Sequence, residues 1–558
     1  MMHAKLFVVV FLCLVCMSSA ELMRLHLFTS TEYQDAHKIA EHHGCTVRGH
    51  VPATKGVYLL ECKDDVQQLE KSVLFEEAKN ESIHFSLQTE KRQLRLSRTE
   101  IPLDPLYASQ WHLHGPPNGR RIHVNAPEAW GMGVHGKSVR LSVVDDGMQH
   151  RHPDLMPNYV SEASFDFNDH DPDPSPSSGH SHGTSAAGVA AAATNSICGV
   201  GVAPMANVAG IRLIADLTTD AQEAMALVYG NADIYSCSWG PIDDARRLEG
   251  PGPLTGAAIE HGVRFGRRGL GAVYVWAGGN GGQTGDNCNY DGYASSRYVI
   301  TVGAIGEYGS LTYYSEPCAA MLISAPTSDR YVGISTTALD GHCTNRFGGT
   351  SAATPLVAGI VALMLEAQPN ATWRDVRYAL MDSAIHTDPT HHSWIRNAAN
   401  RMHSVYYGFG RVDAARAVAR ITEPNETWRA PPARKVIAPL AQPMLEIAHG
   451  GAWTDSFVRL IEDKDNVHAE CVEISVWIQH PHRGDLEIQL QSPGGTISQL
   501  CEWHLDRNAD YDGWTFTSCQ FWDEQTKGLW TLRVRDMGFP PRESLAVFEK
   551  WQLVIHGW

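Results

Sequence analysis

The sequence predicts an α/β domain built on a mostly parallel sheet, followed by a smaller all-β domain. Between about residues 104 and 425, short apolar runs without strict alternation are separated by helix-compatible stretches. This pattern is typical of parallel strands covered by helices on both faces. After residue 432 the pattern changes to short stretches of period two with turn residues between them, which indicates an antiparallel β-sandwich or jelly roll.

The expected elements can be placed along the chain. The strand candidates of the first domain are residues 139–144, 208–213, 234–238, 272–276 and 299–304, and its helix candidates are residues 183–193, 221–228, 256–267 and 350–365. Residues 423–432 are polar and carry prolines, which predicts a connector. The strand candidates of the second domain are residues 473–478, 486–490, 530–534 and 551–555. A chain of 558 residues has room for about two to four domains.

The first 20 residues have the composition of a secretory signal. Lys5 precedes the apolar run 6–16, and Ser18-Ser19-Ala20 offers small residues for cleavage. The run is too short for a comfortable membrane span, and no later stretch is expected to act as a transmembrane anchor. We therefore expect a product that is soluble inside the secretory pathway (Golgi or endosomal lumen) or secreted.

Charge and cysteine content restrict the partners and the compartment. The formal net charge is −17, so a nucleic-acid partner is not expected and basic ligands are favoured. Of the twelve cysteines, Cys13 and Cys16 lie in the predicted signal, and the others are disulfide candidates in an oxidising compartment. Cys237, inside an apolar strand, is expected to stay a free core residue. Glycan acceptor sequons occur at Asn80, Asn370 and Asn425.

Three stretches together suggest a catalytic triad. Ser351 begins a buried apolar helix, where the free N–H groups and the helix dipole favour a developing negative charge, although an ordinary Ser/Thr helix cap is the alternative. Asp145 ends an apolar strand, at the edge where catalytic groups of open α/β sheets gather. His182 starts a helix rich in Ala and Gly. A serine nucleophile needs an imidazole base and a carboxylate that orients it, and the order Asp, His, Ser is a known triad order.

Several motifs carry a resemblance to a known family. They are Asp145-Asp146-Gly147 with His152-Pro-Asp154-Leu, His182-Gly-Thr184, Trp239-Gly-Pro241, Ala277-Gly-Gly-Asn280-Gly-Gly and Gly349-Thr-Ser351-Ala. Together they are similar to the subtilisin-fold proteases, and above all to the kexin/furin proprotein convertases. The similarity runs from about residue 100 to the C-terminus. It implies a subtilisin-like α/β catalytic domain followed by a jelly-roll P domain, which His482-Arg-Gly-Asp485-Leu, Ser492-Pro-Gly-Gly-Thr and Gly528-Leu-Trp-Thr-Leu resemble.

The resemblance also implies a domain plan. We expect a signal at residues 1–20, a small α+β propeptide at 21–98, a peptidase S8 catalytic domain at 99–425 and a P domain at 426–558. The propeptide matches the family in position and size, and it is expected to inhibit its own protease. Arg95-Leu-Ser-Arg98 predicts self-cleavage after Arg98, with Arg92 as the other candidate and a solvated basic linker as the alternative.

The resemblance assigns roles to further residues around the triad. Asn280 is expected to donate to the oxyanion together with the Ser351 backbone N–H, although Asn-Gly is also plain turn chemistry. Asp243 and Asp291 are expected to read the arginine before the cut, because a guanidinium pairs with carboxylates. Asp146 would face the second substrate residue. Glu223 and Glu249 would hold the arginine four residues back, with a surface carboxylate as the alternative reading of Glu223.

Three departures from the family pattern modify this specificity. Ile242 stands where convertases carry a glutamate, Gly179 falls where an aspartate precedes the catalytic histidine, and Ser185-Ala186 replaces Arg-Cys. We therefore expect arginine to stay favoured at the first and fourth positions. The demand for a basic second residue is expected to be relaxed.

Calcium is the expected ion, because carboxylates and carbonyls are hard oxygen ligands. By resemblance, a first site would combine Asp104, Asp154 and Asn195 with carbonyls near Ala192, Ile197 and Gly199. A second would combine Asp243, Asp286 and Glu316. A third would lie in the run with Asp166, Asp171 and Asp173, which also reads as an acidic loop. The resemblance further pairs Cys198 with Cys343 and Cys288 with Cys318, and Cys501 with Cys519 is an additional expected pair.

The sequence as a whole predicts a calcium-dependent serine endoprotease. It would mature proproteins and peptides by cutting after paired or spaced basic residues, and it is expected to act as a monomer. A broad-specificity secreted subtilisin-like protease is the first alternative, with Ile242 and Gly179 as its arguments. An inactive scaffold acting through its P domain is the second.

Overall fold

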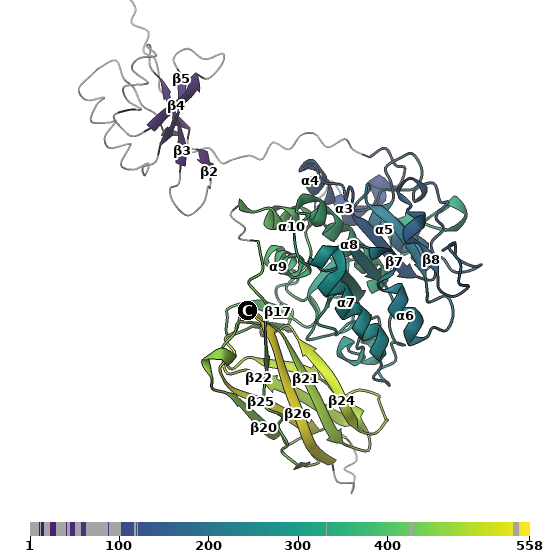
Figure 1. Cartoon of the computed structure of the whole chain (residues 1–558), viewed down its shortest axis with the longest axis vertical. Coiled ribbons are helices and arrows are strands. Elements are labelled where there is room, and N and C mark those ends of the chain that lie inside the picture. Colours follow the sequence, from purple (N-terminus) through teal and green to yellow (C-terminus); the bar gives the residue numbers. More distant parts are fainter. Residues whose placement is uncertain are drawn as a thin grey trace, which may run out of the picture. The chain divides into compact units, whose positions relative to one another are not determined.

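The chain forms two compact units, residues 1–97 with 423–427 and residues 98–422 with 428–558. The computed structural model (Figure 1) describes residues 102–115, 119, 121–330, 332–424, 428–538 and 546–558, with Glu41 and six short strands before residue 89. Arg98, Asn80 and Asn425 lie outside the described residues.

The strands of the first unit form two small sheets. β3 (Met23–Thr29) pairs antiparallel with β2 (Cys13–Val15) and β5 (Val57–Cys62), and β5 pairs with β4 (Cys45–His50). β1 (Val10–Phe11) pairs parallel with β6 (Leu87–Gln88). The predicted signal region therefore includes β1 and β2, and its removal stays a prediction.

A seven-stranded parallel sheet is the centre of the second unit. Its strand order is β13-β12-β11-β10-β7-β9-β8, and every pairing is parallel. The strands are β7 (Arg140–Asp145), β8 (Phe165–Asp166), β9 (Asn207–Arg212), β10 (Ile234–Cys237), β11 (Val273–Ala277), β12 (Val299–Ile305) and β13 (Ile323–Pro326). Five of them lie within two residues of the predicted bounds, because their apolar runs are buried on both faces.

Helices cover both faces of this sheet. Alternate side chains of one strand enter different cores: Val273 and Val275 pack toward α8 (Thr350–Ala367), and Tyr274 and Trp276 pack toward α6 (Asp220–Ala226) and α7 (Pro253–Gly269). The other α-helices among the residues that the structure describes are α3 (Trp111–His114), α4 (Ala126–Gly131), α5 (His182–Ala191), α9 (Trp373–Ser383) and α10 (Ala414–Ile421). α8 is apolar and long enough to cross a membrane, but 83% of it is buried, as expected of a core helix.

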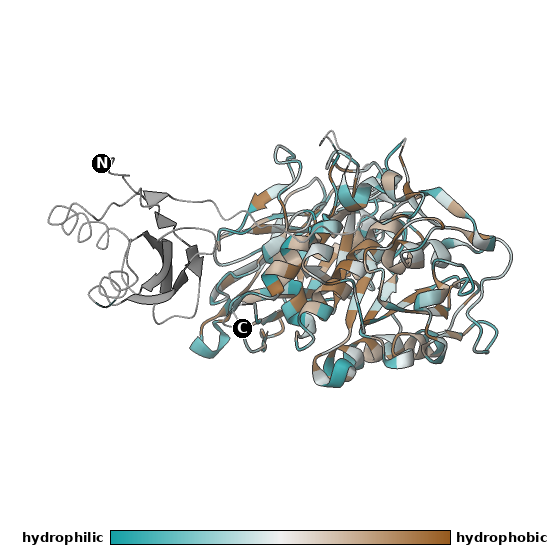
Figure 2. Cartoon of the chain, turned by 90° about the horizontal axis from the view of Figure 1, so that it is seen from above, coloured by the Kyte–Doolittle hydropathy of each residue, from teal (hydrophilic) through white to brown (hydrophobic). Residues whose placement is uncertain are grey.

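Two antiparallel sheets form the β-sandwich after residue 430. One has the order β18-β26-β21-β24 with β19 also on β26, and the other has the order β20-β25-β22-β23. The strands are β18 (Arg434–Ile437), β19 (Leu445–Ile447), β20 (Thr454–Leu460), β21 (Ala469–Gln479), β22 (Leu486–Gln491), β23 (Ile497–Cys501), β24 (Tyr511–Ser518), β25 (Gly528–Asp536) and β26 (Ala546–Gly557). Side chains of both sheets fill one core. In the view of Figure 2, hydrophobic segments of the second unit lie mainly inside and hydrophilic segments mainly on outer loops and helix ends.

The sandwich and the parallel-sheet region are joined by buried contacts. The Asn289 side chain donates to the Thr517 carbonyl (3.1 Å) and accepts from the Thr517 N–H (3.0 Å). The Trp514 indole N–H donates to the Asn289 carbonyl (3.0 Å). Tyr290 and Ala319 of the parallel-sheet region belong to the same hydrophobic core as the sandwich.

Two of the three expected disulfides are present. Cys198 is bonded to Cys343, and Cys288 to Cys318. The expected pair Cys501–Cys519 is wrong, because both residues carry free buried thiols and face different neighbours. Cys501 on β23 lies 3.3 Å from the Tyr511 hydroxyl, whereas Cys519 follows β24 and contacts the Ala320 carbonyl (3.6 Å). Cys237 is free and buried in β10, as predicted.

Candidate active site

Asp145 and His182 meet where β7 ends and α5 begins. His182 Nδ1 lies 2.8 Å from Asp145 Oδ1 and 3.0 Å from Oδ2, and the Asp145 side chain is 1% exposed. Gly183 permits this approach, because a Cβ at Gly183 would lie 2.7 Å from Asp145 Cβ. Burial lowers the pKa of His182, but the neighbouring Asp145 carboxylate outweighs it, so the pKa is raised. The pair is an imidazole with a fixed tautomer, as a general base requires.

The neighbouring carboxylate of Asp146 caps helix α5. Its Oδ2 accepts from the His182 backbone N–H (3.1 Å) and its Oδ1 from the Gly183 N–H (2.7 Å). Two of the free N–H groups at the helix start are satisfied in this way. Burial, followed by the Asp145 charge, raises the pKa of Asp146. The residue predicted to face a substrate therefore has a structural role at the histidine.

Ser351 lies in the first turn of α8, and an unusual proline frees its carbonyl. Pro355 has no N–H, so the Ser351 carbonyl lacks its helical partner and accepts instead from the Ser238 hydroxyl (3.2 Å). The Ser351 hydroxyl in turn donates to the Ser238 carbonyl (3.4 Å). Ser238 follows β10, so this reciprocal pair fixes the start of α8 against the edge of the sheet.

The histidine ring also contacts the segment that leads to Ser351. Phe347 of β15 (Cys343–Phe347) packs edge-on against His182, with ring centroids 5.3 Å apart. No hydrogen bond joins the Ser351 hydroxyl to His182 in the described part of the chain. In enzymes without bound substrate such catalytic hydrogen bonds are often long or poorly aligned.

Asn280 lies beside the start of α8 with a fixed side-chain orientation. Its Oδ1 accepts from the backbone N–H (2.9 Å) and the hydroxyl (3.1 Å) of Thr350. The Nδ2 group is therefore the donor end of the amide, and the Asn280 side chain hydrogen-bonds to the Asp243 carboxyl. Because Nδ2 carries two N–H groups, it can serve Asp243 and an oxyanion together. Gly349, which precedes Thr350, has a φ of +75°, and a Cβ at this position would lie 3.0 Å from Asn280 Oδ1. Glycine therefore permits the close approach of Asn280 to the start of α8.

A cluster of carboxylates adjoins Asn280. The Asn280 N–H donates to Asp243 Oδ2 (2.8 Å), and Asp243, Asp286 and Glu316 have oxygens within 4.8 Å of one another. Asp291 lines the same small cavity of about 20 Å³, which has room for one ion or water molecule.

Burial raises the pKa values of these carboxyls. The pKa of Asp286 rises to about 6 and that of Asp291 to about 8, and the pKa of Glu316 lies well above its ordinary range. Mutual repulsion adds to each shift. A bound cation would relieve both effects, so the donor set fits a hard divalent ion.

A second group of oxygen ligands brings together Asp104, Asp154 and Asn195. Asn195 donates from its N–H to Asp104 Oδ1 (3.0 Å) and from Nδ2 to Asp154 Oδ1 (3.1 Å). The Asn195 Oδ1 accepts from the Ile197 N–H (2.7 Å), and the Gly199 N–H lies 3.4 Å from Asp154 Oδ2. Asp104 Oδ2 is buried without a hydrogen-bond partner among the residues described here. A buried carboxylate oxygen in this position fits a hard cation as its partner.

The run expected to hold a third ion is organised differently. Asp166 forms an ion pair with Arg212, and Asp173 pairs with His150 (3.2 Å). The Asp171 carboxylate accepts from the Asp173 N–H (2.8 Å). These three carboxylates have separate partners and do not converge, which favours the acidic-loop reading.

The acids predicted for the fourth substrate position lie in unequal surroundings. Glu223 accepts from the Tyr293 hydroxyl (2.6 Å) and from the Thr218 hydroxyl (2.7 Å). Glu249 is exposed, and its backbone bridges to Asp291. The sequence analysis did not identify Tyr293 and Thr218 as hydrogen-bond donors to Glu223, although Tyr293 lies only two residues after Asp291.

The departures from the family pattern lie at the surface of this region or support a helix. Ile242 is 64% exposed, and Gly179 is exposed with a φ of +93°. Ser185 is buried and its hydroxyl donates to the Thr337 carbonyl (2.8 Å).

Arg247, which the sequence analysis did not single out, lines the acidic cavity and pairs with Asp244 (2.6 Å).

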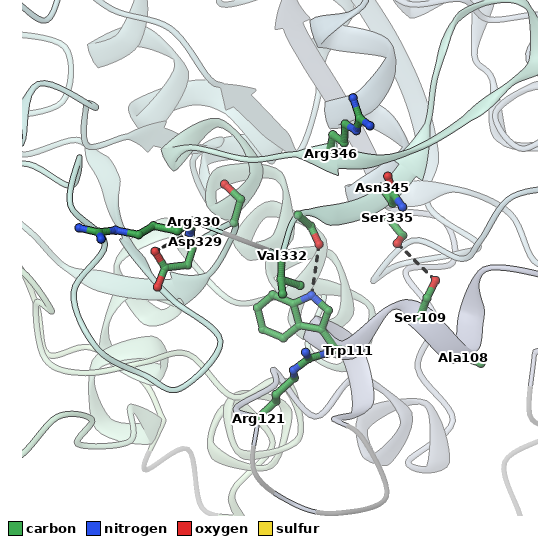
Figure 3. A pocket seen from close by; sticks show the side chains of 12 residues that line it. Ala108, Ser109, Trp111, Arg121, Asp329, Arg330, Val332, Ser335, Asn345 and Arg346 are labelled. Atoms are coloured by element: carbon green, nitrogen blue, oxygen red, sulfur yellow. Dashed lines mark hydrogen bonds between the residues drawn. The ribbon is translucent and has the colours of Figure 1, made fainter.

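A larger cavity of about 660 Å³ lies between α3 and the β14 (Ile334–Thr337)–β15 hairpin (Figure 3). Trp111 forms its floor and donates to the Gly333 carbonyl (3.2 Å), and Arg121, Arg330 and Arg346 surround it. None of the predicted site residues lines it. The triad, the oxyanion asparagine and the acid cluster therefore define a separate site.

Two family models match the chain. The subtilase family model covers residues 136–410, which include all three predicted triad residues, and the proprotein convertase P-domain model covers residues 469–555. The Aeromonas sobria serine protease has a similar structure with a TM-score of 0.73 at 23% identity, covering 84% of this chain and 99% of that one. At this identity the likeness concerns the fold alone.

Curated relatives are more similar in sequence. "Proprotein convertase subtilisin/kexin type 7" of Mus musculus is 36% identical over 94% of this chain and 70% of its own length. "Proprotein convertase subtilisin/kexin type 6" of Homo sapiens is 40% identical over 84% and 50%, and the "Dibasic-processing endoprotease" of Schizosaccharomyces pombe is 40% identical over 81% and 65%. The chain thus spans between half and 70% of the length of these relatives. The chain belongs to the subtilase family of serine endopeptidases, in its proprotein convertase branch with a P domain.

Proposed function

We propose that this protein is a calcium-dependent serine endoprotease that cleaves proproteins after paired or spaced basic residues. One observation carries the proposal. Asp243, which lines the acidic cavity together with Asp286, Asp291 and Glu316, accepts a hydrogen bond from the backbone N–H of Asn280, the predicted oxyanion donor. Carboxylates beside the reacting carbonyl select a cationic side chain before the cut. The names of the convertase and dibasic-processing relatives support the same specificity.

In the proposed reaction His182 is the general base. Its Nδ1 is engaged by Asp145, so Nε2 takes the proton from Ser351 Oγ as the oxygen attacks the substrate carbonyl. Asp145 stabilises the imidazolium that forms. The oxyanion accepts hydrogen bonds from Nδ2 of Asn280 and from the backbone N–H of Ser351. Nδ2 is the donor end of the Asn280 amide because Thr350 holds Oδ1. His182 then protonates the leaving amine, and water hydrolyses the acyl-enzyme by the reverse sequence.

Substrate recognition is assigned to the remaining acids. Asp291 and Asp243 would pair with the arginine before the cut, and Glu223 and Glu249 with an arginine at the fourth position. Asp146 is largely engaged by the start of α5, and Gly179 and Ile242 add no charge. This supports a relaxed demand for a basic second residue.

Calcium would be held at two places. The first set is Asp104, Asp154 and Asn195, where Asp104 Oδ2 is buried and unpartnered, and the second is Asp243, Asp286 and Glu316. When bound, the ion supplies positive charge that keeps the surrounding carboxyls ionised. The third predicted set, Asp166, Asp171 and Asp173, has less support.

Maturation and location complete the proposal. We assign residues 1–20 to a signal, 21–98 to an inhibitory propeptide cut after Arg98, 99–425 to the catalytic domain and 426–558 to the P domain. The product would act as a monomer in the secretory lumen or outside the cell. The two disulfides support an oxidising compartment.

Expression of the chain and of its Ser351→Ala variant tests this proposal. We expect a wild-type product that begins at Thr99 and a variant that stays uncut. Equal cutting in both would contradict self-processing. A wild-type cut after a non-basic residue would favour the broad-specificity alternative.

A further inference from the structure

Two cysteines of the sandwich lie opposite one another on neighbouring strands. β21 and β24 pair antiparallel with Glu473 opposite Thr517 and Val472 opposite Ser518. The next pair outward in this register is Cys471 and Cys519. Directly opposite residues of antiparallel strands have Cα atoms about 4.5–5.5 Å apart, which is within the range that a disulfide spans.

The two side chains are buried and in contact. Cys471 is 2% exposed and Cys519 is 1% exposed, and each thiol shifts the pKa of the other, as neighbouring groups do. In the folded sandwich the interaction with Cys471, together with Arg377, lowers the pKa of Cys519, and Arg377 Nη2 lies 3.7 Å from Cys519 Sγ.

We propose that Cys471 and Cys519 are joined by a disulfide in the mature protein. The inference rests on passage through the oxidising compartment proposed above. The two other free cysteines have different surroundings. Cys501 lies among the Tyr290 and Tyr511 hydroxyls at 3.5 and 3.3 Å, and Cys237 is inside β10. Both stay thiols.

The oxidation requires a disulfide-bearing oxidant, either an oxidoreductase or oxidised glutathione. The thiolate of one of the two cysteines attacks one sulfur of that disulfide, forms a mixed disulfide and releases the first thiol. The other cysteine then attacks the sulfur of the first and releases the second thiol. Two protons leave the cysteines, and their two electrons reduce the oxidant to two thiols. Because both sulfurs are buried in the folded sandwich, the exchange takes place before β21 and β24 are covered.

The bond would stabilise the contact between the sandwich and the catalytic domain. The Cys519 N–H donates to the Ala319 carbonyl (2.8 Å), and Asn397 Nδ2 donates to the carbonyls of Gln520 (3.0 Å) and Trp522 (2.8 Å). The segment after β24 therefore reaches the catalytic domain directly. Cross-linking it to β21 fixes the part of the sandwich that makes these contacts.

Alkylation of the secreted protein under denaturing conditions without reductant tests the proposal. Of Cys237, Cys471, Cys501 and Cys519, we expect only Cys237 and Cys501 to be labelled, and an unreduced digest to contain Cys471 linked to Cys519. Labelling of all four, or a Cys501–Cys519 peptide, would overturn the proposal. The Cys198–Cys343 and Cys288–Cys318 peptides are internal references. If all four cysteines are labelled and these two linked peptides are also absent, the protein has not passed through an oxidising compartment, and the proposed location is what fails.

The disulfide peptide map does not depend on protease activity, so it can also be made on the Ser351→Ala variant. Two cysteine-to-serine variants complete the test. Cys471→Ser should make Cys519 reactive and lower Tm by about 5 °C or more. Cys501→Ser should keep the cross-link and lose only its own label. If Cys471→Ser does not accumulate, the wild-type peptide map decides alone.

Discussion

The Tyr293 hydroxyl donates a hydrogen bond to Glu223 Oε2 across 2.6 Å, and this contact ties Glu223 to the segment that carries Asp291. Tyr293 N–H also donates to Asp291 Oδ1 (2.7 Å). One residue therefore orients the acid proposed for the arginine before the cut and the acid proposed for the arginine at the fourth position.

Tyr293→Phe should weaken selection of arginine at the fourth position. Glu223 keeps its contact with Thr218 but loses a donor worth about 1 kcal/mol, so the preference for Arg over Ala should fall about fivefold. The measurement is kcat/KM for the two peptides. Tyr235→Phe, which loses a hydroxyl contact to the Tyr229 carbonyl away from Glu223, is the matched control and should leave the ratio unchanged. An unchanged ratio in Tyr293→Phe would remove its positioning role.

The raised carboxyl pKa values predict a dependence of stability on pH that calcium suppresses. Asp286 and Asp291 have an ordinary pKa of 3.8, raised to about 6 and about 8 in the fold. Without a cation the folded protein retains protons that the unfolded chain releases. The free energy of unfolding should therefore fall as pH rises between about 4 and 8. Calcium favours the ionised carboxyls and should reduce this slope.

Thermal unfolding in a chelator and in calcium, across that pH range, measures the effect. Calcium addition at about pH 6 should also release protons into a weakly buffered solution. Asp286→Asn should release fewer. Equal pH slopes with and without calcium would contradict a cation site at Asp243, Asp286 and Glu316.

Gly183→Ala should impair both catalysis and stability. The new Cβ would lie 2.3 Å from the Gly147 carbonyl oxygen and 2.7 Å from Asp145 Cβ, so α5 and His182 must shift. We expect a loss of about 1–3 kcal/mol in stability and a fall in kcat of about a hundredfold. Gly256→Ala in α7, with open space around the new methyl, is the control and should be neutral or slightly stabilising. Full activity in Gly183→Ala would show that the close approach is dispensable.

Trp514→Phe should raise KM for arginine substrates with little change in kcat. The indole holds the Asn289 carbonyl two residues before Asp291, and loss of about 1 kcal/mol corresponds to about fivefold. Trp530→Phe loses a similar contact, to the Thr526 carbonyl, inside the sandwich. It should lower Tm without changing KM. Similar KM values in both variants would limit the P domain to a stabilising role.

Patterns that are local in sequence were predictable. The parallel strands appear as apolar runs, and the small residues around Gly183 and Ser351 mark close approaches of helix and sheet. β8 carries only two residues, too few for a recognisable period, and it was missed. β13, which ends at Pro326, was missed as well. α9 and α10 were also absent from the predicted elements.

Contacts between distant residues required the structure. Ser238 and Ser351 are 113 residues apart, and Glu223 and Tyr293 are 70 apart. The Cys501–Cys519 expectation failed for the same reason. Strand register decides which cysteines face one another, and the sequence does not reveal that β21 rather than β23 lies beside Cys519.

The shared core around Tyr290 and Ala319 has a consequence for how this protein can be divided. The ring of Tyr290 stacks on that of His504 with centroids 4.1 Å apart, and Tyr290 contributes to the core of the sandwich. Separating the two domains at the connector would therefore expose apolar surface on both pieces. A truncated protease or an exchanged C-terminal module should therefore aggregate unless the new partner refills this surface. Chimeras between relatives should transfer residues 288–290 and 318–320 together with the sandwich.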